Sequence, residues 1–523
     1  KYRNAGKNKD EVPVLEFRQE CRDFAAHWVD VQREEFQRLG VLADWKRPYT
    51  TMSNDAEASI VSEFLKFAMS GALYQGSKPV MWSPVEKTAL AEAEVEYHDR
   101  QTDAIWVAFR VAGISGSDAL TDLLLDQVGE EKYSEEVQAL SADCANAYVI
   151  IWTTTPWTIP QNRAICYNPA IRYGIYEVLD TPEECWAVKG EKYVMADDLA
   201  EATFARARLE PHQFTRLRDA PPELLDCFTC AHPFEGVPQG GGEWNYPVPV
   251  LRGEHVTADA GTGFVHTAPS HGDDDYAIGR AHGLEMTYNI LDDSSFREDL
   301  PFFGGLRIYD EKGKPGKANK AVIDKLIEVH HLLARQRLTI SDAHSWRSKA
   351  PVIRRATPQW FISMDKPGPN GKSLRENALK AIEDTEFFPA VGRNRLQSMV
   401  EGRPDWLISR QRNWGVPITI FVNKDGQPHT AALEADQAEQ LNDAIKAAIA
   451  KGGVEAWFDT PAEDFLSPLG LPASEWEKVT DVLDVWFDSG TTHAFALRER
   501  GIIDAETGQA DLYMEGSDQH RGW

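Results

Sequence analysis

The chain has 523 residues, and its 82 Asp and Glu residues outnumber its 55 Lys and Arg residues, which gives a formal net charge of −27. This acidity excludes a uniformly basic nucleic-acid-binding protein, although a local basic patch remains possible. The hydrophobic content of 42% is that of a globular protein, and no run of about 18 apolar residues is present to span a membrane. At roughly 100–200 residues per domain, the length indicates about three domains, or one domain split by an insertion.

The six cysteines are scattered along the chain, which fits reduced thiols in a cytoplasmic protein better than a disulfide framework. The N-terminus, KYRNAGKNKDEVP, is polar and has no apolar signal segment. The chain opens on Lys1 rather than Met and stops at Trp523, directly after GSDQHRG. We therefore expect an internal fragment of a longer cytoplasmic protein.

The first elements in chain order are two amphipathic helices, at Glu16–Leu39 and from Asn54 to Gly71, because apolar residues recur there at helical spacing. From about residue 103 the pattern changes to short alternating segments separated by Gly and Pro. The segments predicted as strands are Ala147–Trp152, Tyr173–Val178, Cys185–Val188, Tyr246–Leu251 and Gly263–Val265. They predict a compact, mostly β, barrel-like insertion.

A helical pattern returns at Lys317–Arg337, where we predict a helix. From Ala356 onward, predicted strands and helices alternate. The pattern thus predicts an α/β body interrupted by a β-rich domain. We place the boundaries at residues 1–102, 103–316 and 317–523.

Two turn-rich stretches of the insertion carry the chemistry. In WTTTPWTIPQN (Trp152–Asn162), three threonines end a predicted strand, so Thr153, Thr154 and Thr155 can offer hydroxyl groups to a polar ligand, and Asn162 adds an amide. These threonines are also ordinary strand formers, which leaves a purely structural role open.

The second stretch is GTGFVHTAPSHGDDDY (Gly261–Tyr276), in which His266 ends a strand and Asp275 lies beyond a turn that can return it towards His266. A carboxylate beside hydroxyls and an imidazole suits recognition of an ammonium group next to an ester, with water as the nucleophile. The alternatives are a solvated acidic loop, or a metal-dependent hydrolase whose ligands are His266, His271 and Asp275.

Two other features are weaker. Cys227-x-x-Cys230 has no second Cys pair at a suitable spacing, so it is poor evidence for a metal knuckle. The stretch Arg393–Arg412 holds five arginines among few acids, which leaves open a non-catalytic RNA-binding module or a solvated helix face.

Six long motifs, in this order, resemble the bacterial isoleucyl-tRNA synthetases, which are class I aminoacyl-tRNA synthetases. They are WTTTPWTIPQN, GTGFVHTAPSHGDDDY, RATPQWFISMD (Arg355–Asp365), RPDWLISRQRNWGVPI (Arg403–Ile418), DVLDVWFDSG (Asp481–Gly490) and YMEGSDQHRGW (Tyr513–Trp523). The threonine triplet and VHTAP favour the isoleucyl enzymes over their leucyl and valyl relatives; the valyl enzyme remains the alternative.

The resemblance implies a Rossmann-type catalytic domain that activates isoleucine with ATP and Mg²⁺ and transfers it to isoleucine tRNA. It implies that the β-rich insertion is an editing domain that deacylates valyl-tRNA. Isoleucine and valine differ by one methylene, and the isoleucyl enzymes are the established case in which that difference, about 1–3 kcal/mol in one apolar pocket, requires a second, hydrolytic site. We expect a monomeric, cytoplasmic enzyme without a membrane anchor.

The resemblance also implies residue roles. Thr153, Thr154, Thr155, Asn162, His266 and Asp275 would line the editing pocket, with Asp275 binding the α-ammonium group and His266 helping to exclude the isoleucyl side chain. Glu515, Gly516, Asp518, Gln519 and His520 would contact the aminoacyl-adenylate, and Trp486 and Trp523 would form apolar walls for isoleucine.

The chain departs from the family pattern in two respects. None of its 14 histidines lies in an HxGH motif, and it has no KMSKS-like loop, although the family uses both for the ATP phosphates; we expect both outside this chain. Some relatives carry Cys pairs near two tryptophans, where this chain reads Trp82-Ser83-Pro84 and Ser345-Trp346-Arg347-Ser348. No zinc is therefore predicted.

Overall fold

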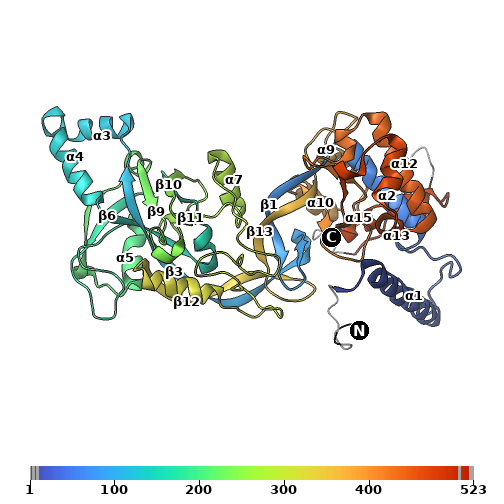
Figure 1. Ribbon diagram of the computed structural model, residues 1–523, viewed down its shortest axis with the longest axis horizontal. Helices are drawn as coiled ribbons and strands as arrows, with labels where there is room; N and C mark the ends of the chain where they lie inside the picture. The colour runs from blue at the N-terminus through green and yellow to red at the C-terminus, as the bar shows by residue number, and fades with distance from the viewer. Residues whose placement is uncertain (1, 3–5, 7–10, 504–507, 517–523) are drawn as a thin grey trace. The chain divides into compact units, whose positions relative to one another are not determined.

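The computed structural model describes residues 2, 6, 11–503 and 508–516, and the chain divides into two compact units (Figure 1). The first unit comprises Lys1–Ser77, Thr88–Ala93 and Pro358–Trp523, and the second comprises Lys78–Lys87 and Glu94–Thr357. The second unit therefore interrupts the first in sequence, and the predicted α/β body with an inserted β-rich part is confirmed.

The first unit is rich in helices. Its helical elements are α1 (Val14–Arg38), α2 (Asn54–Met69), α9 (Leu374–Asp384), α10 (Val391–Glu401), α11 (His429–Ala432), α12 (Ala435–Gly452), α13 (Glu455–Asp459), α14 (Ala462–Leu466), η7 (Ser467–Leu469), η8 (Ala473–Glu475), α15 (Val485–Gly490) and the π-helical turn η9 (His493–Arg498). The two predicted N-terminal helices correspond to α1 and α2.

Helices α2 and α12 pack side by side because each carries apolar residues at helical spacing on one face (Figure 1). Ile60 and Phe64 of α2 and Leu441 and Ile445 of α12 are fully buried in one core cluster. Trp457 of α13 completes this cluster from the next element along the chain. This packing is the main hydrophobic core of the first unit.

The strands of the first unit form small sheets. A four-stranded sheet has the order β14 (Trp406–Leu407), β13 (Ile353–Ile362), β1 (Leu73–Ser83) and β2 (Thr88–Leu90), and two-stranded sheets pair β15 (Ser409–Arg410) with β18 (Val482–Leu483) and β16 (Phe421–Asn423) with β17 (Trp476–Lys478). The chain passes from one unit to the other within β1 and at the middle of β13, between Thr357 and Pro358.

The second unit is built on a ten-stranded mixed sheet. Its strand order is β11 (Phe264–Thr267), β5 (Ala164–Tyr167), β10 (Pro247–Arg252), β9 (Phe228–Ala231), β3 (Val95–Ile114), β4 (Ala147–Thr153), β7 (Lys192–Ala196), β6 (Tyr173–Val178) and β8 (Phe214–Asp219), with β12 (Leu332–Ser345) also paired to β3. Among the described strands the order has two ends, β11 and β8. The predicted β-rich insertion is thus a large mixed sheet, and its described strands do not close into a barrel.

Helices and short turns cover and connect the strands of this sheet. They are η3 (Glu92–Glu94), α3 (Asp118–Val128), α4 (Glu130–Cys144), η4 (Pro156–Gln161), α5 (Asp197–Arg206), η5 (Pro211–Gln213), α6 (Pro222–Leu225), η6 (Pro238–Gly240), α7 (Asp273–His282) and α8 (Ala318–Glu328). The cysteines at all six positions are free thiols, as the sequence predicted. Among the described residues no helix is both long enough and apolar enough to cross a membrane.

Three local predictions were wrong for identifiable reasons. The helix predicted over Lys317–Arg337 ends at Glu328, and β12 follows it, because from Arg335 the side chains alternate between more and less exposed as they pair with β3. The strand predicted at Cys185–Val188 is a turn region. The strand predicted at Val482–Phe487 ends at Leu483, because the Asp484 side chain accepts a hydrogen bond from the Trp486 N–H and starts α15.

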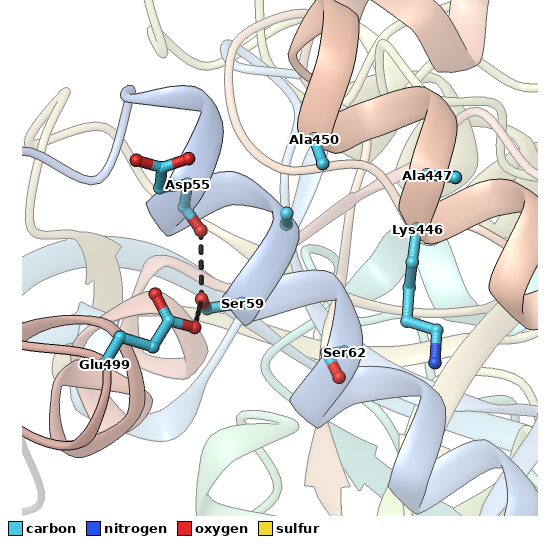
Figure 2. A pocket seen from close by; sticks show the side chains of 8 residues that line it. Asp55, Ser59, Ser62, Lys446, Ala447, Ala450 and Glu499 are labelled. Atoms are coloured by element: carbon cyan, nitrogen blue, oxygen red, sulfur yellow. Dashed lines mark hydrogen bonds between the residues drawn. The ribbon is translucent and has the colours of Figure 1, made fainter.

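A shallow pocket lies beside α2 and α12 in the first unit (Figure 2). The Ser59 hydroxyl donates to the Asp55 carbonyl at 2.9 Å and also contacts the Glu499 carboxylate. Its lining residues are Asp55, Ala58, Ser59, Ser62, Lys446, Ala447, Ala450 and Glu499. None of the residues that the sequence singled out for chemistry is among them, so the candidate site is sought elsewhere.

Candidate functional site

A chain of hydroxyl groups follows the end of β4. Thr153 is the last residue of β4, and its hydroxyl lies 3.1 Å from that of Thr155, which lies 3.2 Å from that of Thr158. Thr155 precedes and Thr158 lies within the 3₁₀ turn η4, in which residues three apart are eclipsed, so the two hydroxyls face the same side. The Thr154 carbonyl is held by the Thr102 hydroxyl at 3.1 Å.

The hydroxyl chain ends on His266. This residue lies in β11, opposite Ile165 of β5, and its Nε2 is 2.9 Å from the Thr158 hydroxyl. The Thr158 hydroxyl donates its single hydrogen to the Thr155 carbonyl at 2.8 Å. With that hydrogen on the Thr155 carbonyl, the Thr158 hydroxyl accepts from His266, which assigns the imidazole hydrogen to Nε2 and leaves Nδ1 as a hydrogen-bond acceptor.

His266 is neutral near pH 7. Burial, with a smaller contribution from His271, lowers the pKa of His266 to about 4. Its Nδ1 is buried and has no hydrogen-bond partner among the described residues. A buried acceptor without a partner is costly, so this atom marks a place where a ligand donor fits.

Asp275 stands in the first turn of α7, beyond the turn that follows β11. Its Oδ2 accepts a hydrogen bond from the Ala268 N–H at 3.3 Å, which returns the carboxyl group to the end of β11. Burial, with smaller contributions from Asp274 and Asp273, raises the pKa of Asp275 to about 7, while the Ala268 hydrogen bond opposes the shift. A cation placed beside this carboxyl group would restore its charge.

The neighbouring acids differ from Asp275. Asp273 and Asp274 are exposed, and the Asp273 carboxylate forms an ion pair with Arg354. Of the three, only Asp275 has a carboxyl group that faces the protein, and burial raises its pKa to about 7.

Asn162 is fully buried and contributes a further acceptor. Its Nδ2 donates to the Ala164 carbonyl at 2.8 Å, and its Oδ1 has no partner among the described residues. The preceding residue, Gln161, is fully buried, with neither side-chain polar atom paired in the described part of the chain. Unpaired polar atoms thus gather around η4, β11 and the turn before α7.

Hydroxyl contacts join Thr153 and Thr155 to His266 through Thr158, a residue that sequence reasoning missed. The spacing could have shown it, since Thr158 lies three residues after Thr155 in the same Pro-rich turn. The contact of Thr158 with His266 joins residues 108 positions apart, and no local pattern encodes it.

A metal site is not formed by these residues. In the described part of the chain, no group of three or more His, Cys, Asp or Glu side chains is arranged to hold a metal ion. The Nε2 of His266 bonds to Thr158, and the Nδ1 of His271 lies 2.9 Å from the Arg354 carbonyl. His266, His271 and Asp275 therefore do not converge as ligands.

The second predicted site lies in the first unit and is described only in part. Trp486 is in α15, whose N-terminus is capped by Asp484, and Asp484 forms a buried ion pair with Arg410 at 3.1 Å. Glu515 and Gly516 are exposed. The other predicted contacts, Asp518, Gln519, His520 and Trp523, lie outside the described residues.

The arginine-rich stretch 393–412 is not one solvated surface. Arg395 in α10 is exposed, whereas Arg410 is 4% exposed and ion-paired with Asp484. Arg393 donates to the Thr385 carbonyl at 2.8 Å. The stretch is therefore not one solvated helix face, because Arg410 is buried while Arg395 is exposed.

Comparison with known proteins identifies the class. A family model described as "tRNA synthetases class I (I, L, M and V)" matches residues 1–523. The chain belongs to this family of class I tRNA synthetases.

Within the family, the chain is similar to isoleucine–tRNA ligases, and the resemblance stated from the motifs is confirmed. It is 51% identical to the one from Ruegeria pomeroyi over 532 residues, covering 100% of this chain and 52% of that protein. It is 49% identical to the one from Mesorhizobium japonicum over 538 residues, again covering 100% of this chain and 52% of that protein. The chain spans about half the length of these relatives.

A solved structure, the editing domain of the P. falciparum cytosolic leucyl-tRNA synthetase, is similar to part of the chain, with 13% identity and a TM-score of 0.24, covering 34% of this chain and 64% of that structure.

Proposed function

We propose that the second unit is the editing domain of an isoleucine–tRNA ligase and that it hydrolyses valyl-tRNA formed on isoleucine tRNA. The observation that carries this proposal is the run of contacts from Thr153 through Thr155 and Thr158 to His266, with the half-buried Asp275 carboxyl group returned to the end of the strand that holds His266. Hydroxyl groups, a neutral imidazole and one half-buried carboxyl group suit an aminoacyl ester, which combines a cation with a polar, uncharged reacting centre.

In the proposed reaction, the oxygen of a water molecule bonds to the ester carbonyl carbon. The bond from that carbon to the ribose oxygen breaks, and the ribose oxygen takes up a proton. Asp275, as the carboxylate, pairs with the α-ammonium group and fixes the ester in the pocket. Thr153, Thr154 and Thr155 supply hydroxyl and backbone groups to the 3′ adenosine and the ester, and Asn162 supplies its free amide oxygen.

His266 serves as a wall and an acceptor in this scheme, not as a general base. A group whose pKa is about 4 is too weakly basic to remove a proton efficiently near pH 7. The imidazole is fixed by Thr158 on one side. A fixed ring can exclude the longer isoleucyl side chain while leaving room for valyl, which gives the site its size selectivity.

For the whole enzyme we propose ATP-dependent activation of isoleucine, with Mg²⁺, and its transfer to isoleucine tRNA, in a cytoplasmic monomer. The first unit would be the catalytic portion, with Trp486 and Trp523 beside the isoleucine side chain and Glu515, Gly516, Asp518, Gln519 and His520 at the aminoacyl-adenylate. The described residues present no carboxylate cluster suited to a metal, so we derive no step through Mg²⁺.

The test is deacylation of valyl-tRNA and isoleucyl-tRNA, both charged on isoleucine tRNA, by this chain. We expect hydrolysis of the valyl ester and sparing of the isoleucyl ester, with loss of activity in Asp275→Ala. The matched control is Asp274→Ala, which removes an exposed acid from the same helix turn and is expected to retain activity. Equal hydrolysis of both esters, with Asp275→Ala harmless, would falsify the proposal.

A further inference from the structure

His271 is held in a fixed orientation within the turn between β11 and α7. Its backbone N–H donates to the Ala268 carbonyl at 2.8 Å, and its Nδ1 lies 2.9 Å from the Arg354 carbonyl. Its ring meets the edge of the Trp157 ring with centroids 4.9 Å apart. The backbone, one ring nitrogen and one ring face are therefore all constrained.

The hydrogen bond to Arg354 determines the tautomer of His271. A carbonyl oxygen only accepts, so Nδ1 carries the hydrogen and Nε2 carries the lone pair. Burial, as the largest cause, lowers the pKa of His271 to about 4, so the ring is neutral at pH 7. Nε2 is buried and has no hydrogen-bond partner among the described residues.

His271 and His266 thus adopt opposite tautomers, but each ring keeps one nitrogen that can accept a hydrogen bond. His266 bonds through Nε2 to Thr158 and leaves Nδ1 free, whereas His271 bonds through Nδ1 to Arg354 and leaves Nε2 free. Each ring offers one buried acceptor nitrogen. Buried acceptors without partners indicate that a donor-rich ligand group belongs among them.

The residue next to His271 in the chain lies against the Asp275 carboxyl group. A Cβ atom added to Gly272, the next residue, would lie 2.7 Å from Asp275 Oδ2, and Asp275 also accepts from Ala268, at the start of the same turn. An ammonium group has three N–H donors. One carboxylate can take some of them, and a neutral acceptor can take another without adding a second negative charge to the pocket.

We propose that His271 is a substrate-positioning residue whose Nε2 accepts a hydrogen bond from the α-ammonium group of the aminoacyl ester beside Asp275. The Arg354 carbonyl presents that nitrogen by holding the other one. This inference rests on the proposed editing function.

The experiment compares two esters on isoleucine tRNA: valyl, which carries the ammonium group, and 2-hydroxyisovaleryl, in which a hydroxyl group replaces it. The variants are His271→Phe, which keeps a ring against Trp157 but removes the acceptor, and His271→Gln, which restores an acceptor near the position of Nε2. The matched control is His282→Phe, the same change at an exposed histidine of α7. Single-turnover kcat/KM is measured for every pair of variant and ester.

We expect His271→Phe to lower kcat/KM on the valyl ester by on the order of 10- to 100-fold, the loss of one hydrogen bond to a charged group. On the hydroxy ester its loss should be about threefold at most, with His271→Gln recovering much of the valyl activity and His282→Phe unchanged. Equal losses on both esters, or no loss at all, would overturn this inference while leaving the proposed function standing. A parent chain that hydrolyses neither ester overturns both.

Discussion

Replacing Asp275 by asparagine should stabilise the folded protein at high pH while it abolishes editing. The amide oxygen of asparagine can still accept the Ala268 N–H, which is 3.3 Å from Oδ2 in the parent, so the local hydrogen bond survives. The substitution removes the negative charge of the Asp275 carboxylate, which burial makes unfavourable. The proposed editing function therefore needs a carboxylate at this position, whereas the stability of the fold at high pH favours an uncharged side chain.

The magnitude follows from the pKa of Asp275, which rises from its ordinary value of 3.8 to about 7 in the folded protein. Because the folded state holds this proton more tightly than the unfolded state, the free energy of unfolding falls as the pH rises between these two values. The full difference is at most about 4 kcal/mol above pH 7, and it vanishes below about pH 3, where both states are protonated.

The assay is urea unfolding of the parent and Asp275→Asn at several pH values from 4 to 8, followed by a signal from the second unit. We expect the stability difference to grow with pH in favour of the variant. Asp274→Asn, an exposed neighbour, should follow the parent at every pH. A constant difference between the Asp275→Asn and parent curves across this range would refute the claim that burial holds the carboxyl group protonated.

Three further predictions follow from the same contacts. Deacylation of valyl-tRNA should rise with pH through about 7, because Asp275 must ionise to bind the ammonium group; a kcat/KM profile that is flat from pH 5.5 to 7.5 would contradict this. Thr158→Ala should lower the free energy of unfolding by about 1–3 kcal/mol, or weaken editing to a comparable degree, because His266 loses its hydrogen-bond partner at 2.9 Å. Thr158→Ser keeps the hydroxyl group and should restore what is lost. Equal defects in both variants would count against the hydrogen bond. Arg410→Leu should cost about 3–5 kcal/mol because it leaves the buried Asp484 charge unpaired, whereas the exposed Arg395→Leu should stay within about 0.5 kcal/mol in the same denaturation assay.

The sequence predicted the helical parts of the first unit well because each helix repeats its apolar residues locally. Ile60 and Phe64 mark the buried face of α2 within a few residues of each other, and such a period can be read without a partner. The prediction failed where a long-range partner decides the outcome. The segment after Glu328 becomes a strand because it pairs with β3, so that Arg335 lies opposite Ile105, and an amphipathic helix would have satisfied the local pattern equally well.

The candidate site shows the same division. The residue types of Thr153, His266 and Asp275 already indicated an ester pocket, because hydroxyls, an imidazole and a carboxylate in turn-rich segments are poor core material. The metal alternative used the same residues and was equally compatible with their order in the chain. What separates the two is the placement of the side chains, because no group of three or more His, Cys, Asp or Glu among the described residues is arranged to hold a metal ion.

By itself, then, the sequence determined the family and the strand ends at which Thr153 and His266 stand, since motifs and periodicity are properties of short segments. Tertiary structure decided the protonation states of His266 and Asp275, because burial and the partner of each polar atom depend on segments far apart in the chain. Asp275 differs from Asp274 in neither residue type nor local spacing. Its pKa is about 7 only because the fold turns its carboxyl group inward, against Ala268.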